Sequence, residues 1–495
     1  MKRVNQSRMA VILLLSALLA SCGGEGAADT TEAVSTADSL QTTEAVTEAG
    51  PQSTVEAKDF GGENVHFLLY SNSDYQNSAM DVAAEETNGE ALNDAVFQRN
   101  DRLIEKFNID ITWEDPGNAT IAANKLKQAV LGGDDSYDIS FISTYESTLA
   151  GIDGRMLDMN TVPHITLENP WWNGRMAKDT AIMDVNYFFI GDMNLDTWTQ
   201  SYVTYYSKTV AANHDIDGLY DIVRNGEWTF DKLDELTRTV YRDVNGNGAY
   251  DENDLYGLTA CSVCIDCFWA ASGINMVVKD AEGVPSYSFD SQFYDMYDRI
   301  VNLLQAPQML YTDRPQYTSK RDTYDRGAFM EDRALFFIEG LCVAGNLLRS
   351  METDYGILPL PKYDAAQENY RTYSHTTHNS TVSLPVTSAG KVDMLGMILE
   401  DMAFYSMELV RPAYYENMLN AKLARDEESI EMLEIITTNV SYDLMFVLNH
   451  NFAFQQLRGA LNRSDNAASF IEKQEKLLNS SIEKQITSIR ENLAQ

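Results

Sequence analysis

Short apolar runs alternate with longer amphipathic stretches across residues 65–142, and this order limits the fold more than any other feature. The apolar runs, which predict buried strands, cover 65–70, 108–113 and 138–142. The amphipathic stretches, which predict helices, cover 91–107 and 124–131. Strands that alternate with helices pair in parallel through right-handed crossovers. The sequence therefore predicts an α/β fold in which a mostly parallel sheet is flanked by helices.

Polar and aromatic residues stand at the ends of the first and third predicted strands. Tyr70, Ser71 and Asn72 end or follow the first strand, and Tyr145 follows the third. In open parallel sheets, ligands bind beyond the carboxyl ends of the strands. We therefore expect these four residues to face a ligand-binding cleft.

The first 21 residues have the pattern of a secretory leader. Three basic residues flank the start of an apolar run, 9–20, that is too short to cross a bilayer. The run leads into Leu19-Ala20-Ser21-Cys22, which resembles the lipobox at which bacterial lipoproteins are lipidated and cleaved. This predicts a signal peptide over 1–21, a lipid-modified Cys22, and a lipid-anchored protein on the extracellular face of the cell membrane. An ordinary signal peptide with an incidental cysteine is the alternative.

Residues 22–57 predict a disordered tether. After Cys22 this segment contains no lysine or arginine and consists mainly of Thr, Ala, Glu and Ser. Such a composition lacks the apolar surface needed for a core. As a flexible coil, the segment would hold the following domain about 30 Å from the membrane.

The charge balance excludes two classes of partner. The chain has 37 Lys and Arg against 74 Asp and Glu, a formal net charge of −37 that repels nucleic acid and anionic lipid head groups.

Residues 58–495 are too many for one core and divide most naturally into two lobes. The hydrophobic fraction of 44% indicates a folded globular protein, which we expect to be a monomer.

Residues 243–254 match the calcium-binding loop of EF-hands. Oxygen-bearing side chains stand at positions one, three, five, nine and twelve, glycine stands at six, and a backbone carbonyl is available at seven. The predicted ligands are Asp243, Asn245, Asn247, Ala249, Asp251 and Asp254. Asp254 replaces the usual glutamate, which predicts weak binding of a structural Ca²⁺. The alternative is a metal-free turn capped by its own Asx side chains.

Three cysteines, Cys261, Cys264 and Cys267, form a C-x-x-C-x-x-C run, and Cys342 stands apart from them. The run is one thiolate short of an iron–sulfur or zinc site, and no spacing places Cys342 nearby. A metal site, a disulfide and unligated core residues are the three alternatives. We expect unligated thiols.

Several segments, taken in order, resemble extracellular solute-binding proteins that serve ABC importers. They are Gly191-Asp192, Thr204-Tyr205-Tyr206-Ser207-Lys208, Trp228-Thr229-Phe230-Asp231-Lys232-Leu233, Leu255-Tyr256-Gly257, 329–336, 355–361 and 411–415. No segment is specific alone, and the resemblance rests on their order and spacing across most of residues 58–495. It implies the type II periplasmic-binding-protein fold, with two α/β lobes that close on a ligand held between them.

The resemblance also implies lobe boundaries. The first lobe covers 58–202 and 380–410, and the second covers 203–379 and 411–495, with extra helices at the carboxyl end. The last of these helices, over 469–493, is expected to pack on the second lobe. Its predicted buried stripe is Ile471, Leu477, Leu478, Ile482, Ile486 and Ile489.

Sugar-binding sites pair aromatic platforms with planar polar side chains, because sugars present flat C–H patches and a rim of hydroxyls. The resemblance implies ligand contacts from Trp198, Gln200 and Trp269, with Asp192, Glu339 and His375 as further polar lining. The Trp171-Trp172 pair is an additional candidate. There are three alternatives. Each tryptophan could pack in the core, and each carboxylate could be solvated. The His375-x-x-His378 pair could bind a metal ion.

The function implied by the resemblance is a lipid-anchored receptor. Such a receptor captures a solute, here an oligosaccharide, between two lobes and delivers it to the permease of an ABC transporter. A peptide or another polar solute is the alternative ligand, since the fold does not fix what it holds. A surface carbohydrate-active hydrolase is the alternative from another class, although the sequence contains no recognisable catalytic motif. We therefore expect a binding protein and not an enzyme.

Overall fold

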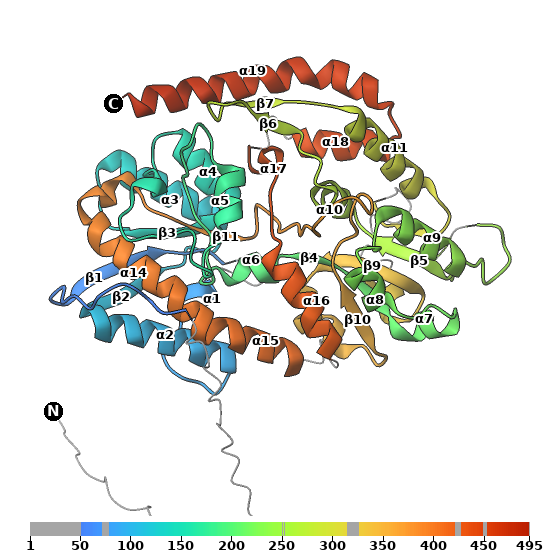
Figure 1. Ribbon diagram of the computed structural model, residues 1–495, viewed down its shortest axis with the longest axis horizontal. Helices are drawn as coiled ribbons and strands as arrows, with labels where there is room; N and C mark the ends of the chain where they lie inside the picture. The colour runs from blue at the N-terminus through green and yellow to red at the C-terminus, as the bar shows by residue number, and fades with distance from the viewer. Residues whose placement is uncertain are drawn as a thin grey trace, which may run out of the picture. The chain divides into compact units, whose positions relative to one another are not determined.

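Two β-sheets, each flanked by helices, organise the computed structural model (Figure 1). The structure describes residues 51–71, 79–249, 251, 253–313, 326–420, 427–448 and 453–494. Two predicted residues, Cys22 and Asn72, lie outside the described residues. The segment from Pro51 to Gln495 forms one compact unit. None of its described helices combines the length and the apolar character that a membrane crossing requires.

The first sheet has the strand order β11-β3-β1-β2. Its strands are β1 (Glu63–Leu68), β2 (Ile109–Glu114), β3 (Ile139–Ser143) and β11 (Ser380–Ser383). β1 pairs in parallel with β2 and with β3, and β11 pairs antiparallel with β3. The predicted parallel pairing of the first three strands is therefore confirmed.

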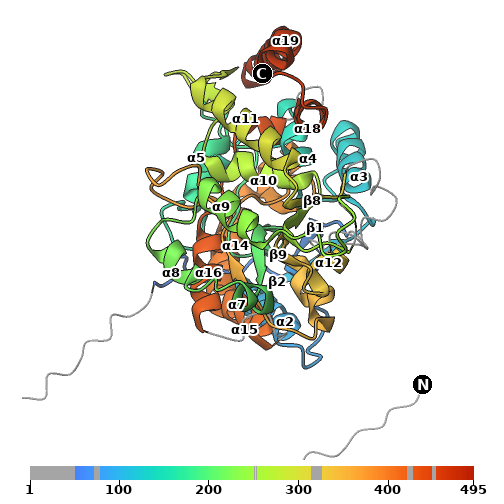
Figure 2. The same cartoon turned by 90° about the vertical axis from the view of Figure 1, so that its right-hand side faces the viewer.

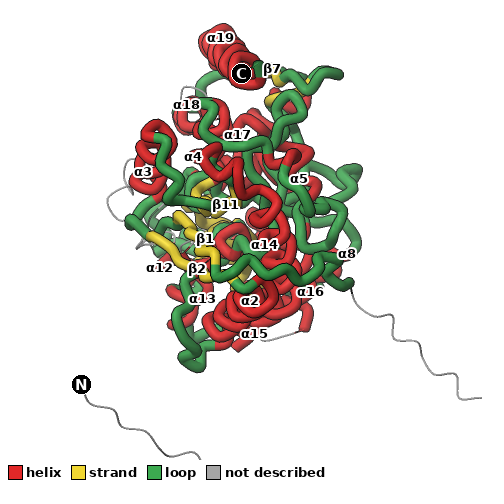
Figure 3. The backbone as a smooth tube through the Cα atoms, turned by 90° about the vertical axis from the view of Figure 1, so that its left-hand side faces the viewer, coloured by secondary structure: helices red, strands yellow, loops and turns green. Residues whose placement is uncertain are grey.

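Helices cover both faces of the first sheet. They are α2 (Ala91–Phe107), α3 (Ala119–Gly132), α4 (Thr144–Ile152) and α14 (Val392–Tyr405). α3 and α4 lie on one face, and α2 and α14 lie on the other (Figures 1 and 3). α2 has its predicted bounds. α3 starts earlier than predicted because the Asn118 side chain caps it, accepting a hydrogen bond from the Ile121 amide at 2.9 Å.

The second sheet has the order β10-β4-β9-β5-β8. Its strands are β4 (Tyr202–Ser207), β5 (Tyr256–Ala260), β8 (Met309–Tyr311), β9 (Ala334–Gly340) and β10 (Tyr355–Leu358). β5 pairs in parallel with β8 and β9, whereas β4 is antiparallel to both of its neighbours. The sheet is therefore mixed, because β4 enters it from the first sheet and runs against β9. Its longer helices are α9 (Phe230–Val240), α10 (Val263–Ser272) and α11 (Ser291–Gln305).

Two chain segments connect the sheets and lie side by side. The first contains α6 (Leu195–Thr199) and leads into β4, and the second, residues 372–379, leads into β11. Ser201 and Ser374 form an antiparallel bridge. The Tyr202 amide donates to the Tyr373 carbonyl at 2.8 Å, on the same stretch. These hydrogen bonds hold both segments in a fixed register between the sheets.

Shorter elements complete the fold. They are α1 (Ala79–Val82), η1 (Met159–Thr161), α5 (Gly174–Thr180), α7 (Lys208–Asn213), α8 (Leu219–Arg224), β6 (Val277–Lys279), β7 (Pro285–Tyr287), α12 (Gly327–Met330), α13 (Cys342–Asn346), η4 (Leu348–Ser350) and η5 (Val386–Lys391). After α14 follow η6 (Ser406–Val410), α15 (Arg411–Asn420), α16 (Glu427–Thr438), α17 (Leu444–Leu448), α18 (Ala453–Asn462) and α19 (Ala467–Leu493).

The carboxyl-terminal helices depart from the predicted division of the chain. α15 starts at residue 411, where the second lobe was expected to resume, but it packs on α2 beside the first sheet. α19 lies over α11 and α18 (Figure 2). It also contacts α4 of the first sheet, because Ser488 Oγ and Asn492 Nδ2 both donate to the Ile152 carbonyl, at 3.0 and 2.9 Å. The helix thus contacts helices of both sheets, and Leu477 of its predicted stripe is 47% exposed.

A buried carboxylate on α14 holds the loop before α5. Glu400 is fully buried and accepts hydrogen bonds from Trp171 Nε1 at 3.1 Å and Trp172 Nε1 at 2.7 Å. It also accepts from the Thr166 amide at 3.2 Å and from Asn169 Nδ2 at 2.6 Å. These four hydrogen bonds give an acceptor to N–H groups of the loop, some of which would otherwise be buried without a partner.

We expect Glu400→Leu to lower the free energy of unfolding by about 3 kcal/mol or more, since two indole N–H groups, the Thr166 amide and the Asn169 side-chain amide lose their acceptor. Denaturant unfolding followed by tryptophan fluorescence measures this loss. The matched control is Glu472→Leu, at an exposed position of α19. Equal stability of the two variants would contradict the role given to Glu400.

Candidate functional site

Residues of α4, of the second sheet and of both connecting segments come close where the two connecting segments lie side by side. Gln200 and Tyr202 belong to the first segment and the start of β4, and His375 belongs to the second segment. Glu339 comes from the end of β9, and Tyr145 comes from the start of α4. We call these five residues the central cluster. All except Tyr202 are residues that the sequence predicted to contact ligand.

Backbone pairing positions the members of the central cluster. The β4–β9 ladder places Tyr202 opposite the residue that follows Glu339. The Tyr202 ring centroid lies 6.4 Å from that of His375. The Tyr145 amide donates to the carbonyl of Thr376 at 3.0 Å. The end of β3, the start of β4, the end of β9 and the second connecting segment therefore converge.

Two buried polar groups on the first connecting segment lack hydrogen-bond partners among the described residues. Gln200 is 2% exposed, and its Nε2 has no partner. Asp196 is 1% exposed, and its Oδ1 accepts from Thr199 Oγ1 at 3.3 Å whereas its Oδ2 has no partner. Burial raises the pKa of Asp196 well above its usual value, and the nearby Asp81 raises it further. Leaving such a group unpaired costs about 1–3 kcal/mol, so each would gain from a ligand hydroxyl.

Glu339 is a positioned acceptor and not a solvated carboxylate. It is 2% exposed, and its Oε2 lies 3.4 Å from Arg326 Nη2. Its Oε1 accepts from the Gly340 amide at 3.1 Å. A carboxylate oxygen can accept more than one hydrogen bond, so Glu339 retains capacity for hydroxyl donors.

His375 is held neutral. Burial, and then the neighbouring His378, lower its pKa to about 3, and the two ring centroids are 4.3 Å apart. A neutral imidazole has one donor and one acceptor nitrogen, which suits contact with hydroxyl groups. Metal binding by this pair lacks support, because no group of three or more His, Cys, Asp or Glu side chains among the described residues could hold an ion.

The residues at the end of β1 diverge. Tyr70 is 1% exposed in the core, where burial, then Asp196 and Asp81, raise its pKa well above its usual value. The Tyr70 hydroxyl therefore lies near the first connecting segment. Ser71 Oγ instead donates to the Gly117 carbonyl at 3.1 Å, in the loop after β2.

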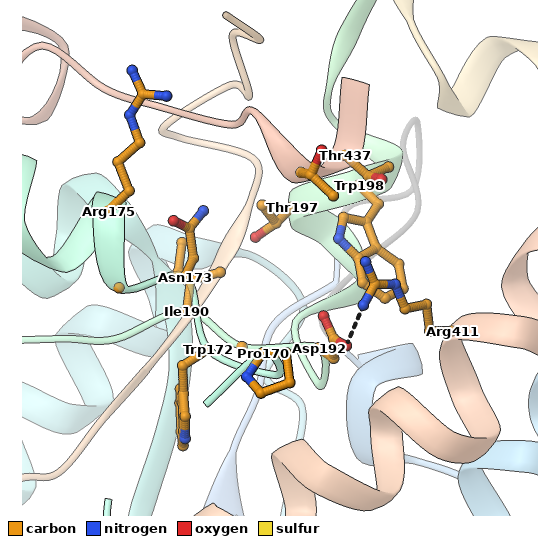
Figure 4. A pocket seen from close by; sticks show the side chains of 13 residues that line it. Pro170, Trp172, Asn173, Arg175, Ile190, Asp192, Thr197, Trp198, Arg411 and Thr437 are labelled. Carbon is orange, nitrogen blue, oxygen red and sulfur yellow. Dashed lines mark hydrogen bonds and ion pairs between the residues drawn. The ribbon is translucent and has the colours of Figure 1, made fainter. Parts of the chain in front are cut away.

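Asp192 and Trp198 lie in a separate cavity of about 260 Å³, which we call the Trp198 cavity (Figure 4). Its lining includes Pro170, Trp172, Asn173, Gly174, Arg175, Ile190, Gly191, Asp192, Thr197, Trp198, Arg411, Thr437 and Thr438. No member of the central cluster is among these residues. Arg411 Nη1 lies 3.2 Å from Asp192 Oδ2, and this ion pair joins α15 to the loop before α6. The structure thus separates predicted site residues into two places.

Trp269 lies in neither place. It is 1% exposed on α10 and stacks on Phe293 of α11, with centroids 5.0 Å apart. This is the core packing that the sequence left open as the alternative. Trp171 is also a core residue, because its indole N–H is committed to Glu400, and Trp172 donates to the same carboxylate.

Sequence reasoning missed several residues beside these sites. Asp196, Tyr202, Arg326 and Arg411 were not predicted. Asp196 lies two residues before Trp198 and could have been included with it. Arg411 could not have been paired with Asp192 by spacing, because 219 positions separate them.

The loop 243–254 folds around its predicted ligands. Asp243 accepts from the amides of Gly246 at 2.7 Å and Gly248 at 2.8 Å, and Gly248 has the left-handed backbone expected of a glycine at position six. Asn245 Nδ2 and Asn247 Nδ2 donate to Asp251 at 3.1 and 2.7 Å, so these side chains converge. Hydrogen bonds, first from the Asn253 amide, lower the pKa of Asp251 to about 2.

The loop can coordinate a Ca²⁺ ion only if side-chain amide oxygens and a backbone carbonyl oxygen also act as ligands. Asp254 is fully buried and accepts weakly from the amides of Val244 and Asp251, each at 3.3 Å. The described acidic side chains alone do not form a metal cluster. Asn245, Asn247 and the carbonyl of Ala249 would have to complete the shell, which agrees with the weak binding predicted from position twelve.

The four described cysteines are buried, and none is in a disulfide. Burial raises the pKa of Cys264 and Cys267 well above the usual value, and the neighbouring thiols add to it. Buried, protonated thiols act as small core residues.

Neither a family model nor a curated protein matches the sequence. Solved structures do match. The sugar-binding protein MalE of Xanthomonas citri has a TM-score of 0.58 at 11% identity, over 85% of this chain and 98% of that one. UspC of M. tuberculosis has a TM-score of 0.55 at 11% identity, over 84% of this chain and 100% of that one. The substrate-binding protein Lmo0181 of Listeria monocytogenes, in complex with cycloalternan, has a TM-score of 0.52 at 10% identity, over 86% of this chain and 99% of that one.

These structures share the two-lobed periplasmic-binding-protein fold, and the present chain has that fold. At such identities the likeness establishes the architecture alone.

We expect acid to destabilise the protein through His375. Its pKa of about 3 lies below the usual 6.5, so the unfolded state binds more protons and stability falls as the pH drops below about 6.5. Between pH 7 and pH 5 the advantage of wild type over His375→Asn should shrink by about 2 kcal/mol in denaturant unfolding. His214→Asn, at the end of α7, is the control. A pH dependence unchanged by His375→Asn would refute the assignment.

Proposed function

We propose that this protein is a solute-binding receptor that captures an oligosaccharide between its two sheets. The observation that carries the proposal is the pair of unpartnered buried groups, Gln200 Nε2 and Asp196 Oδ2, on the segment that joins the sheets. Native proteins rarely leave such groups unpaired, and a hydroxylated ligand supplies both a donor and an acceptor.

The central cluster favours a neutral, hydroxyl-rich solute. His375 is neutral and Glu339 already faces Arg326, so neither offers an unmatched charge to an ionic ligand. Tyr145 and Tyr202 add aromatic rings to these planar polar groups, which is the combination that sugars require. Two proteins with the same fold support this class of ligand, since Lmo0181 is in complex with cycloalternan and MalE of Listeria monocytogenes is in complex with maltose.

Capture would proceed by closure of the two sheets on the ligand. Members of the central cluster come from α4 beside the first sheet, from the second sheet and from both connecting segments, so a solute bound among them would contact all of these parts at once. A ligand that bridges them stabilises the closed arrangement by its preference for that state. A small change in backbone angles of the paired segments is enough for opening and closing.

The leader and tether support a membrane-anchored receptor. A lipid-modified Cys22 would hold the protein at the extracellular face of the cell membrane, with residues 23–50 as the tether. Residues 51–57, which were predicted as part of the tether, belong to the folded unit instead, since Ser53 Oγ donates to Asp401 and Val55 packs on the core of the first sheet. We propose that the permease of an ABC transporter accepts the solute from the closed form. A peptide-binding receptor and a surface hydrolase are the competing functions.

Isothermal titration of the full chain with maltotriose and cycloalternan tests the proposal. We expect one of these sugars to bind and to be recovered uncleaved. Gln200→Leu should weaken binding about tenfold, because it removes one ligand hydrogen bond, whereas Gln455→Leu, on the exposed face of α18, should not. Cleavage of the sugar would favour the hydrolase. Binding of peptides in place of both sugars would favour the peptide receptor.

We also propose that the loop 243–254 binds a structural Ca²⁺ ion. The support is the convergence of Asn245, Asn247 and Asp251 around the turn that starts at Asp243. When bound, the ion would hold the loop that precedes β5 in one conformation.

Calcium at millimolar concentration should raise the midpoint of thermal unfolding, and a chelator should reverse the effect. Asp251→Asn should abolish the calcium-dependent shift, since it removes one charged ligand. Asp101→Asn, at an exposed position of α2, should retain it. If calcium does not change the midpoint of thermal unfolding of the wild-type protein, the loop is a metal-free turn.

A further inference from the structure

Two buried carboxyl groups, Asp81 and Asp196, lie close together on the side of the connecting segments that faces the first sheet. Asp81 belongs to α1 and is fully buried, Asp196 belongs to α6 and is 1% exposed, and the two short helices are in contact (Figure 1). Burial raises the pKa of Asp81, and hydrogen bonds, one of them from the Asp196 amide, oppose the rise. Two carboxylates that share a buried place do not both ionise readily.

The groups around the pair supply one positive charge among the described residues. Arg99 of α2 is fully buried, and burial lowers its pKa only to about 10, so the guanidinium stays charged at neutral pH. Its N–H groups donate to the Asp81 carbonyl, to Asn100 Oδ1 and to Ser406 Oγ. The other titratable groups that face the pair have pKa values raised first by burial and are neutral at pH 7. They are Tyr70, Cys342 and Tyr414.

One proton makes this buried group of side chains neutral. Arg99 contributes one positive charge, and Asp81 and Asp196 contribute two negative charges if both are ionised. A net charge in the interior of a protein is costly, because the surrounding medium solvates it poorly. A single proton on either carboxyl group balances the three side chains, and two interacting carboxyl groups then titrate as a pair.

The hydrogen bonds of Asp81 are those of an ionised carboxylate. Its Oδ1 accepts from the Leu195 amide at 2.8 Å, and its Oδ2 accepts from Ser380 Oγ. The Ser380 hydroxyl oxygen itself accepts from Asn194 Nδ2 at 3.3 Å, so the Ser380 O–H is directed to Asp81. Both oxygens of Asp81 therefore act as acceptors and have no place for a proton.

The hydrogen bonds of Asp196 leave one oxygen for the proton. Its Oδ1 accepts from Thr199 Oγ1 at 3.3 Å, whereas its Oδ2 has no partner among the described residues. A protonated carboxyl group is a donor through one oxygen and an acceptor through the other. With the hydrogen on Oδ2, Asp196 keeps its bond from Thr199 and gains an O–H that requires an acceptor.

We propose that Asp81 and Asp196 keep one proton between them at neutral pH, and that this proton makes Asp196 a hydrogen-bond donor to the bound sugar. The donor role rests on the proposed function, whereas the proton itself does not. A hydroxyl oxygen of the ligand accepts from Asp196 Oδ2. Because Arg99, Asp81 and the protonated Asp196 are together neutral, this part of the site favours uncharged solutes over ionic ones.

The pH dependence of unfolding tests the proton without any ligand. In the unfolded chain both carboxyl groups are ionised above about pH 5, so the folded chain holds one extra proton and loses stability as the pH rises. Between pH 6 and pH 8, the unfolding equilibrium constant of the full-length wild type, divided by that of Asp196→Asn, should rise about tenfold for each pH unit. Asp196→Ser is a second neutral replacement, to be used if the asparagine variant does not fold.

The control for this measurement is Asp110→Asn, at an exposed position of β2, whose ratio to wild type should not change with pH. The titration of His375 is present in all of these proteins and cancels in each ratio. A ratio of wild type to Asp196→Asn that stays constant with pH would overturn the shared proton.

Isothermal titration with maltotriose and cycloalternan at pH 7 tests the donor role. Asp196→Leu removes the donor and should weaken binding about tenfold. Asp196→Asn supplies an N–H in place of the O–H and should recover most of that loss. The same two changes at Asp110 serve as controls. If the asparagine variant binds no better than the leucine variant, Asp196 does not act as a donor.

The outcomes separate this inference from the proposed function. If neither sugar binds wild type, the proposed function is refuted together with the donor role, and the unfolding ratio still decides whether the proton is shared. If a sugar binds and the unfolding ratio stays constant with pH, the proposed function stands and the present inference is refuted.

Discussion

The antiparallel contact between the two connecting segments is the constraint on which the rest of the structure depends. The bridge between Ser201 and Ser374 fixes where Gln200 and His375 lie, and the Leu341 amide, which donates to the Ser201 carbonyl at 2.8 Å, ties the end of β9 to the same point. Gln200, His375 and the end of β9 stay close together because these backbone hydrogen bonds leave little freedom at their meeting point.

Buried charge reinforces this contact on the side of the first sheet. The carboxylate of Asp81 accepts from the Leu195 amide at 2.8 Å and from Ser380 Oγ, so one side chain links the first connecting segment to the start of β11. Burial raises the pKa of Asp81 to about 7, and Arg99 and the two hydrogen bonds oppose the shift. A raised carboxyl pKa removes stability as the pH rises toward 7, whereas the lowered pKa of His375 removes stability as the pH falls below about 6.5. Asp81 therefore lowers the stability of the folded state as the pH rises, and His375 lowers it as the pH falls.

The local pattern of the sequence predicted more of the fold than of the site. The strands and helices of the first sheet follow from apolar periodicity over 65–142, and the helix over 91–107 has its predicted bounds. The mixed pairing of the second sheet and the contact of α19 with Ile152 depend on residues far apart in the sequence, such as Tyr202 with Gly340 and Ile152 with Ser488, which no local pattern encodes. Among site residues, the strand ends led to the prediction of Tyr145, whose amide donates to the Thr376 carbonyl beside the second connecting segment; its contact with a ligand stays a prediction. Trp269 was expected at the ligand and lies in the core, because an apolar aromatic residue has the same signature in either place.

The central claim is that a sugar bridges the two sheets at the paired segments, and a crystal structure of the full chain with a bound oligosaccharide tests it most directly. The account predicts electron density for the sugar within hydrogen-bond distance of Gln200 Nε2 and of at least one of Glu339 and His375, in contact with both sheets. A sugar that contacts only one sheet, with Gln200 Nε2 still unpaired, would contradict it.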